Sequence, residues 1–184
     1  MILNLQDFLF KLKNRVDFSN EEKVILQLHA DWGKQIAPDM AAHFYSYLKR
    51  DAEMNSILNN KENRLHHLHQ TFIQWFYEMF TGIDDWGNAY AQRRWQIGIV
   101  HVQVGISPQH VVPAMAAVVY EVGKRVKTDG KDESLRNALS KICMIDLAFI
   151  EQAYVEISAA AVLQETGWTE SLFKRLVTTG AGSM

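Results

Sequence analysis

Along most of the chain, apolar residues recur every three or four positions, with polar residues between them. This spacing places the apolar side chains on one face of an α-helix. No stretch alternates between apolar and polar residues as a half-buried β-strand does. The pattern predicts an all-α chain of about seven helices, near residues 3–15, 20–34, 38–50, 61–81, 85–104, 108–127 and 132–163.

Cap and proline signals predict several helix ends. Ser107 is a suitable N-cap, and Pro108 after it fits the first turn of a helix, where its missing amide hydrogen is not needed. Pro38 is expected to open the third helix, and Pro113 falls where it can kink the sixth. The small and polar residues at 177–184 predict disorder or a linker stub.

Composition narrows the class of protein. The chain has 184 residues, 48% of them hydrophobic, which suits one domain with a sizeable core. A net charge of −2 offers no basic surface for nucleic acid or anionic lipid. The most apolar stretch, 142–163, carries three acidic residues, so we do not expect it to span a membrane. A single cysteine, Cys143, fits a reducing compartment, and we expect a cytoplasmic protein.

One histidine lies in the apolar helical run "IGIVHVQV". On a helical wheel, His101 shares its face with Tyr90, Arg94, Ile97 and Val104. The residues alone leave two interpretations open. His101 is either a core histidine bonded to a backbone carbonyl, or an axial ligand to haem. In the second case, Ile97 and Val104 touch the porphyrin and Arg94 lies near a propionate.

The surroundings of His101 match the motif of a known family. The stretch "RRWQIGIVHVQVGISPQHVVPAM" (93–115) resembles the haem-bearing globin domain of globin-coupled sensors, in the protoglobin-like lineage. There, the pattern I-G-x-x-H-x-x-x-G-I-x-P joins two helices. The stretches 41–51 and 63–76 resemble two further helices, and the likeness covers roughly 18–165. The matching residues of the motif are Ile97, Gly98, His101, Gly105, Ile106 and Pro108.

This resemblance implies a globin fold that holds haem. By family position, His101 is the proximal ligand of the haem iron, Tyr45 is the distal hydrogen-bond donor to O₂, and Leu68 is a distal pocket residue. The chain lacks the C-x-x-C-H sequence of covalent attachment, so the haem is expected to be b-type. The residues expected to contact it are Phe44, Tyr45, Leu68, Phe72, Tyr90, Arg94, Ile97, His101 and Val104. The expected division is an extra N-terminal helix at 1–18, a sensor globin domain at 19–165, and a tail or linker stub at 166–184.

The distal side has competing interpretations. Either Tyr45 or the nearby Tyr47 could pack with its hydroxyl at the surface. His69 lies at the edge of an apolar helical stripe and is the rival distal residue. A zinc site built from His66, His67 and His69 is disfavoured, because the three do not share one helical face.

Two helices are too apolar to bury only one face. The run "VVPAMAAVVY" in the helix at 108–127 has no charge, and the end of the helix at 132–163 has few polar residues. The second apolar face predicts a homodimer in which these two helices form a four-helix bundle with a second copy. The resembling family also dimerises through its helices G and H. The alternative is an unusually central helix in a monomer.

The resemblance implies a haem-based O₂ sensor that also binds CO and NO. The ligation state is expected to pass through the dimer interface to an output domain or partner, and we expect no catalysis by this chain. Family members usually carry a C-terminal transmitter, and none fits in the residues after 165. The alternatives are a haem dioxygenase for NO that needs a separate reductase, and a globin-like module that has lost haem.

Overall fold

The computed structural model describes residues 3–59 and 64–182, and their regular structure is entirely helical. The expectation of an all-α chain is therefore confirmed. In chain order the helices are α1 (Leu5–Arg15), α2 (Asn20–Leu28), α3 (Ala30–Leu48), α4 (Ala52–Asn59), α5 (Arg64–Asp85), α6 (Asn88–Gln103), α7 (Pro108–Thr128), α8 (Glu133–Thr166) and α9 (Glu170–Ala181).

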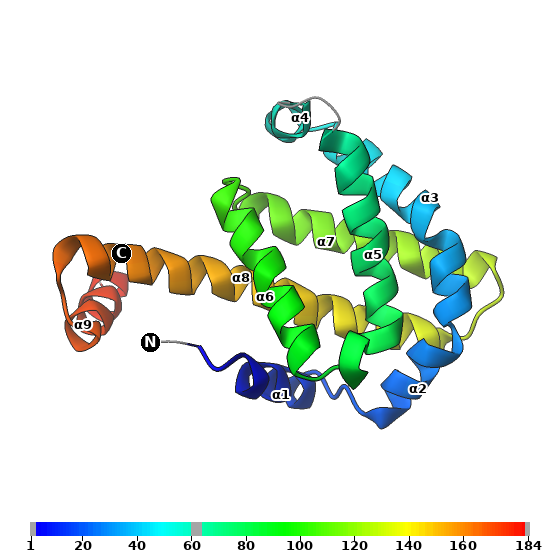
Figure 1. The fold of residues 1–184 in the computed structure, drawn as a ribbon, viewed down its shortest axis with the longest axis horizontal. Coiled ribbons are helices and arrows are strands. Elements are labelled where there is room, and N and C mark those ends of the chain that lie inside the picture. Colours follow the sequence, from blue (N-terminus) through cyan, green and yellow to red (C-terminus); the bar gives the residue numbers. More distant parts are fainter. Residues whose placement is uncertain (1–2, 60–63, 183–184) are drawn as a thin grey trace.

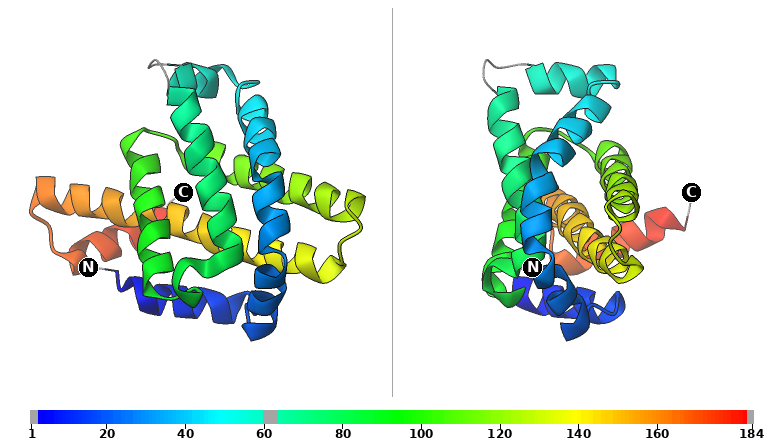
Figure 2. Two further views of the ribbon diagram at one scale, coloured as in Figure 1. Left: turned by 45° about the vertical axis from the view of Figure 1, so that its right-hand side comes forward. Right: turned by 90° about the vertical axis from the view of Figure 1, so that its right-hand side faces the viewer.

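The helices form two crossed layers. The long helices α7 and α8 pack against each other, and α5 and α6 cross over them (Figure 1). Helix α3 packs on α5 and α7, and α1 lies across one end of α6 and α8. Helix α4 lies at the far end of α5 (Figure 2). The buried apolar side chains of these layers join into one core.

Several helix ends follow the local signals in the sequence. Ser19 and Glu22 form a reciprocal capping box at the start of α2. Helix α7 begins at Pro108 after Ser107, as predicted. Gly105 follows α6 with a φ of +74°, a conformation that glycine adopts without the strain a Cβ would add.

The prediction for Pro38 was wrong. The break between α2 and α3 falls at His29, where neither glycine nor proline marks it, and α3 then runs through Pro38. His29 closes the break itself, because its backbone N–H and its ring Nδ1 bond the carbonyls of Leu26 and Ile25. Proline removes one helical hydrogen bond, but the buried Ile36 and Met40 on either side hold α3 in the core.

Two helices and the start of a third differ from the expected ones. Helix α4 was not predicted, and α9 lies in the segment expected to be a tail or linker stub. None of the side chains of α9 is buried, so it is helical without contributing to the core. Between α5 and α6, the carboxylate of Asp84 accepts three backbone N–H groups and so fixes the start of α6 at Asn88.

No helix in the described ranges is long and apolar enough to cross a lipid bilayer.

Candidate functional site: an apolar cavity with one free imidazole nitrogen

An apolar cavity of about 370 Å³ lies between α3, α4, α5, α6 and α7. This volume is within the range of small-molecule and cofactor sites. Most of its wall consists of aliphatic and aromatic side chains. The predicted contact residues that line the cavity are Phe44, Tyr45, Leu68, Phe72, Ile97, His101 and Val104.

His101 is fixed by a hydrogen bond within its own helix. Its Nδ1 lies 2.8 Å from the carbonyl oxygen of Ile97, one turn earlier on α6. Burial lowers the pKa of His101, although the bond to Ile97 opposes this shift. The imidazole is therefore neutral at pH 7, with its proton on Nδ1 and its lone pair on Nε2. This is the form that ligates a metal, and a carbonyl partner on the second nitrogen is typical of such ligands.

This geometry is compatible with both interpretations of His101 from the sequence. The ring does bond a backbone carbonyl, as a core histidine would. The same bond leaves Nε2 available on a side chain that lines the cavity.

Close packing sets the position of α6. A Cβ added at Gly98 would lie 2.7 Å from the Cβ of Ala153 and 3.0 Å from the carbonyl oxygen of Phe149, both on α8. Any larger residue would push α6 away from α8 and move His101 with it. Gly98 therefore fixes the distance between the two helices.

Tyr45 places a buried hydroxyl group in the cavity wall. Its side chain on α3 is 7% exposed, and its hydroxyl donates to the carbonyl oxygen of Leu68 at 3.0 Å. Burial raises the pKa of Tyr45 well above the usual value, so the phenol keeps its proton. Tyr45 can therefore act as a hydrogen-bond donor inside the cavity.

His69 does not line this cavity. Its ring stacks on that of Tyr45, with the ring centroids 4.6 Å apart. Burial is the main cause that lowers the pKa of His69, and nearby positive charge on Lys49 adds to it. His69 therefore packs against Tyr45 from outside the cavity. Of these two residues, Tyr45 lines the cavity.

The histidines at 66, 67 and 69 do not form a metal-binding cluster. In the part of the chain that the structure describes, the group with ligand atoms close enough for a metal ion is Asp51, Glu53 and His110. Its side chains have local partners: Asp51 accepts the backbone N–H of Met54, and Glu53 pairs with His110 at 3.1 Å. The two carboxylates lie at the start of α4, where acidic groups stabilise a helix.

Tyr90 and Arg94 do not line the cavity, so the predicted contact of Arg94 with a haem propionate was wrong. Arg94 is 1% exposed and pairs with Glu78 and with Asp146, the latter at 2.9 Å. Tyr90 donates to Asp146 at 2.7 Å, and the Arg94 guanidinium lies 4.1 Å from its ring centroid. A helical wheel places Arg94 and His101 on one face of α6. It does not show what this face contacts: α5 and α8 near Arg94, and the cavity near His101.

This buried ionic cluster stands directly behind the cavity wall. Trp75 lines the cavity, and its indole N–H donates to Asp146 at 2.9 Å. The backbone carbonyl of Trp75 accepts a hydrogen bond from Arg94 at 3.2 Å. Burial alone would lower the pKa of Arg94, but Asp146, Tyr90 and Glu78 outweigh burial and raise it. Arg94 is therefore a permanent cation that ties α5, α6 and α8 together.

Comparison with known proteins assigns the chain to a family. The family model named Protoglobin matches residues 6–158. The chain belongs to the protoglobin family. Its structure is similar to the globin domain of a globin-coupled sensor from Geobacter sulfurreducens, with a TM-score of 0.72 and 26% sequence identity. The match covers 78% of this protoglobin and 95% of the other chain, and it confirms the globin fold. A search of curated proteins gave no match.

Membership of the family implies a haem cofactor, and the cavity residues of this protoglobin fit one. Haem is a flat, largely apolar ring whose iron needs an axial ligand. The cavity offers apolar walls and a neutral imidazole whose Nε2 makes no hydrogen bond within the described ranges. When bound, haem supplies an iron centre that takes small gas molecules as ligands.

Several wall residues of this protoglobin were missed by the sequence interpretation. Helix α4 supplies Met54, Ile57 and Leu58, which could not be placed because α4 itself was not predicted. Arg93, next to Arg94, lines the cavity with a side chain that is 33% exposed. Their neighbours on α7 and α8 are Val111, Ala114, Met115, Val118 and Ile150.

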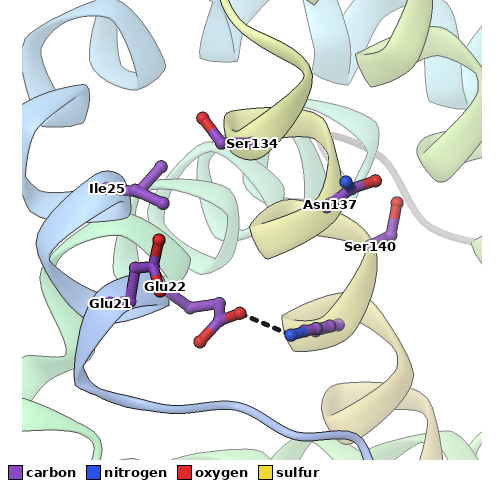
Figure 3. Close-up of a pocket in the computed structure, with 7 residues that line it drawn as sticks. Glu21, Glu22, Ile25, Ser134, Asn137 and Ser140 are labelled. Carbon is purple, nitrogen blue, oxygen red and sulfur yellow. Dashed lines mark hydrogen bonds and ion pairs between the residues drawn. The ribbon is translucent and has the colours of Figure 1, made fainter.

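A second hollow of this protoglobin, between α2 and α8, is polar (Figure 3). Glu22 on α2 pairs there with Lys141 on α8. Burial opposes ionisation of Glu22, but hydrogen bonds from Lys141 and Ser19 outweigh it and lower its pKa to about 2. The ion pair of Glu22 with Lys141 joins α2 to α8, and we assign this hollow no ligand.

Proposed function

We propose that this protoglobin is a haem-based gas sensor domain that binds one b-type haem through Nε2 of His101. The observation that carries the proposal is the arrangement around His101: its Nδ1 is fixed on Ile97, and its ring lines an apolar cavity. O₂ is the proposed physiological ligand, and CO and NO are expected to bind as well.

The residues of the chain have distinct proposed roles. His101 holds the cofactor, and Ile97 and Val104 cover its apolar surface. Leu68 and Phe72 exclude water from the cavity, because water competes with a gas ligand. Tyr45 donates a hydrogen bond to the ligand. Arg93, a partly exposed cation at the cavity, replaces Arg94 as the proposed partner of a propionate.

Replacing Tyr45 by phenylalanine tests the distal side. The hydroxyl now donates to Leu68, and rotation about its C–O bond would direct its one proton to a gas ligand. A hydrogen bond to an acceptor with partial negative charge is worth roughly 1.5–3 kcal/mol, so loss of the hydroxyl should speed O₂ dissociation about tenfold or more. CO carries less negative charge, and its release should change less. Stopped-flow measurement of both rates is the check.

Tyr47→Phe is the matched control, because Tyr47 does not line the cavity. It should leave the O₂ dissociation rate unchanged. If Tyr45→Phe leaves the rate unchanged while a substitution of His69 alters it, Tyr45 is not the donor.

We further propose that the domain is a homodimer through α7 and α8. Exposed apolar side chains on α8 include Met144, Val155 and Val162. They are separated by eleven and seven positions, close to whole numbers of helical turns, and so lie on one face. Val112 and Tyr120 are exposed on α7. A second copy of the same surface is the simplest cover for these residues.

Val155→Glu tests this interface. A buried, unpaired carboxylate costs several kcal/mol, so the dimer should dissociate at micromolar concentration. Val24→Glu is the control, because Val24 on α2 is 52% exposed and Val155 is 60% exposed. Sedimentation, with the Soret band as a check on folding, should show a dimer for the wild type and the control, and a monomer for Val155→Glu. A wild type that sediments as a haem-loaded monomer contradicts the interface.

The expected flow of information is from the haem to α7 and α8, and from there to a transmitter domain or partner protein. This transmission, the transmitter and a cytoplasmic location stay predictions. The family assignment and the similarity to a sensor globin domain support the first of them.

A further inference from the structure

One tyrosine on α8 bonds the backbone of the segment that carries His101. The hydroxyl of Tyr154 lies 3.1 Å from the carbonyl oxygen of His101, and it also bonds the carbonyl oxygen of Ile106. A phenol has a single proton, so it can fully satisfy only one of these two acceptors at a time. The two carbonyls lie on either side of Gly105, where the chain turns from α6 to α7.

The other hydrogen bonds of the turn are local backbone bonds, and Ile106 packs against the core. The N–H of Ile106 bonds the carbonyl of His101 at 3.0 Å, which closes the turn on itself. A Cβ added at Gly105 would meet no atom within 4 Å, so nothing packs closely on that side. In the described ranges, Tyr154 makes the only side-chain hydrogen bonds from α8 to residues 97–107.

The surroundings of Tyr154 keep its hydroxyl a donor. Burial raises the pKa of Tyr154, and the neighbouring carboxylate of Glu151 raises it further. Oε1 of Glu151 is buried without a hydrogen-bond partner among the described residues. Tyr154 is also adjacent to Val155, on the exposed apolar face of α8.

We propose that Tyr154 is a positioning residue that links the peptide of His101 to α8, so that displacement of His101 reaches the α8 surface around Val155. The proposal rests on the proposed function, because it assigns the route by which ligand binding alters that surface. A shift of α6 changes the distances from the Tyr154 hydroxyl to the two carbonyls. The hydroxyl proton of Tyr154 then bonds one of the two carbonyls in preference to the other. This change in hydrogen bonding alters the position of Tyr154 and therefore of α8.

Hydrogen exchange followed by mass spectrometry tests the link. The haem-loaded wild type and Tyr154→Phe are compared in the ferrous and CO-bound states, in peptides that cover 101–107 and 150–158. Without the hydroxyl, the amides of Gly105 and Ile106 should exchange about fivefold faster, the effect of losing one ordinary hydrogen bond. CO should alter the exchange of 150–158 in the wild type, and most of that change should disappear in Tyr154→Phe.

A vibrational measurement and a control variant separate a positioning role of Tyr154 from a loss of general stability. The iron–histidine stretching band of ferrous Tyr154→Phe should shift while its haem content and exchange in α2 and α3 stay at wild-type levels. The matched control is Tyr47→Phe, because Tyr47 on α3 lies outside both the cavity and the proposed dimer interface. The control should reproduce the wild type in every readout.

The outcomes are distinct. If Tyr154→Phe matches the wild type at 101–107 and 150–158, the link is refuted and haem binding stands. If CO leaves 150–158 of the wild type unchanged, this route of transmission is refuted as well. If the wild type takes up no haem, the proposed function fails, and faster exchange of Gly105 and Ile106 in the apo variant still tests the bond itself.

Discussion

Replacing His101 by alanine is expected to remove most of the haem from the purified protein. The reason is the chemistry of the cavity: His101 presents a neutral ring with Nε2 free, held in place by the carbonyl of Ile97 at 2.8 Å. The remaining wall is mostly hydrocarbon, which can hold a porphyrin by contact but cannot ligate its iron. Haem content per chain, measured from the Soret band without added imidazole, is the readout. Added imidazole should restore part of the spectrum.

A matched control uses the other histidine at the cavity. His110 also lines it, but its Nε2 lies 3.1 Å from a carboxylate oxygen of Glu53. His110→Ala should therefore retain its haem and its ferrous spectrum. Undiminished haem content and an unchanged ferrous spectrum in His101→Ala would show that another residue ligates the iron.

Replacing Arg94 by methionine is expected to destabilise the fold by about 3–5 kcal/mol, because it leaves buried carboxylates without their cation. Asp146 is 1% exposed and Glu78 is 7% exposed, so neither can recover its hydration without local unfolding. The loss is large beside a total stability of about 5–15 kcal/mol for a typical domain. Urea unfolding of the apo-protein, followed by circular dichroism, measures it without any contribution from the cofactor.

Arg93→Met serves as the control for Arg94→Met. Arg93 pairs with the same Glu78, but at 3.4 Å and with a third of its side chain exposed. Exposed ion pairs contribute about 0–1 kcal/mol, so this variant should unfold near the wild-type urea concentration. Equal destabilisation by the two substitutions would mean that the buried cluster has no special role in holding α6.

The sequence predicted the features that depend on local signals. The start of α7 at Pro108 uses residues whose conformational preference is strong enough to appear without a structure. The cap at Ser19 and the positive φ of Gly105 use residues of the same kind. His101 could be singled out because an imidazole in an apolar helical run, within the motif of a known family, needs a partner. Its partner at Ile97 follows from the helix itself.

The features that the sequence did not predict depend on tertiary contacts. Pro38 would end an isolated helix, yet α3 continues because Ile36 and Met40 are buried on both sides of it. Arg93 and Arg94 are adjacent in the sequence but lie in different surroundings. Arg94 pairs with Asp146 of α8, and Arg93 lines the cavity. No property of the two side chains distinguishes them before α8 is in place.

The central claim, that this protoglobin binds one haem through His101, is tested most directly by titrating the purified apo-protein with haemin and recording the absorbance spectrum. We expect a Soret band that grows linearly and saturates at one haem per chain, with the pyridine haemochrome spectrum of b-type haem. A titration that shows no saturation, or a spectrum that remains that of free haemin, would contradict the account.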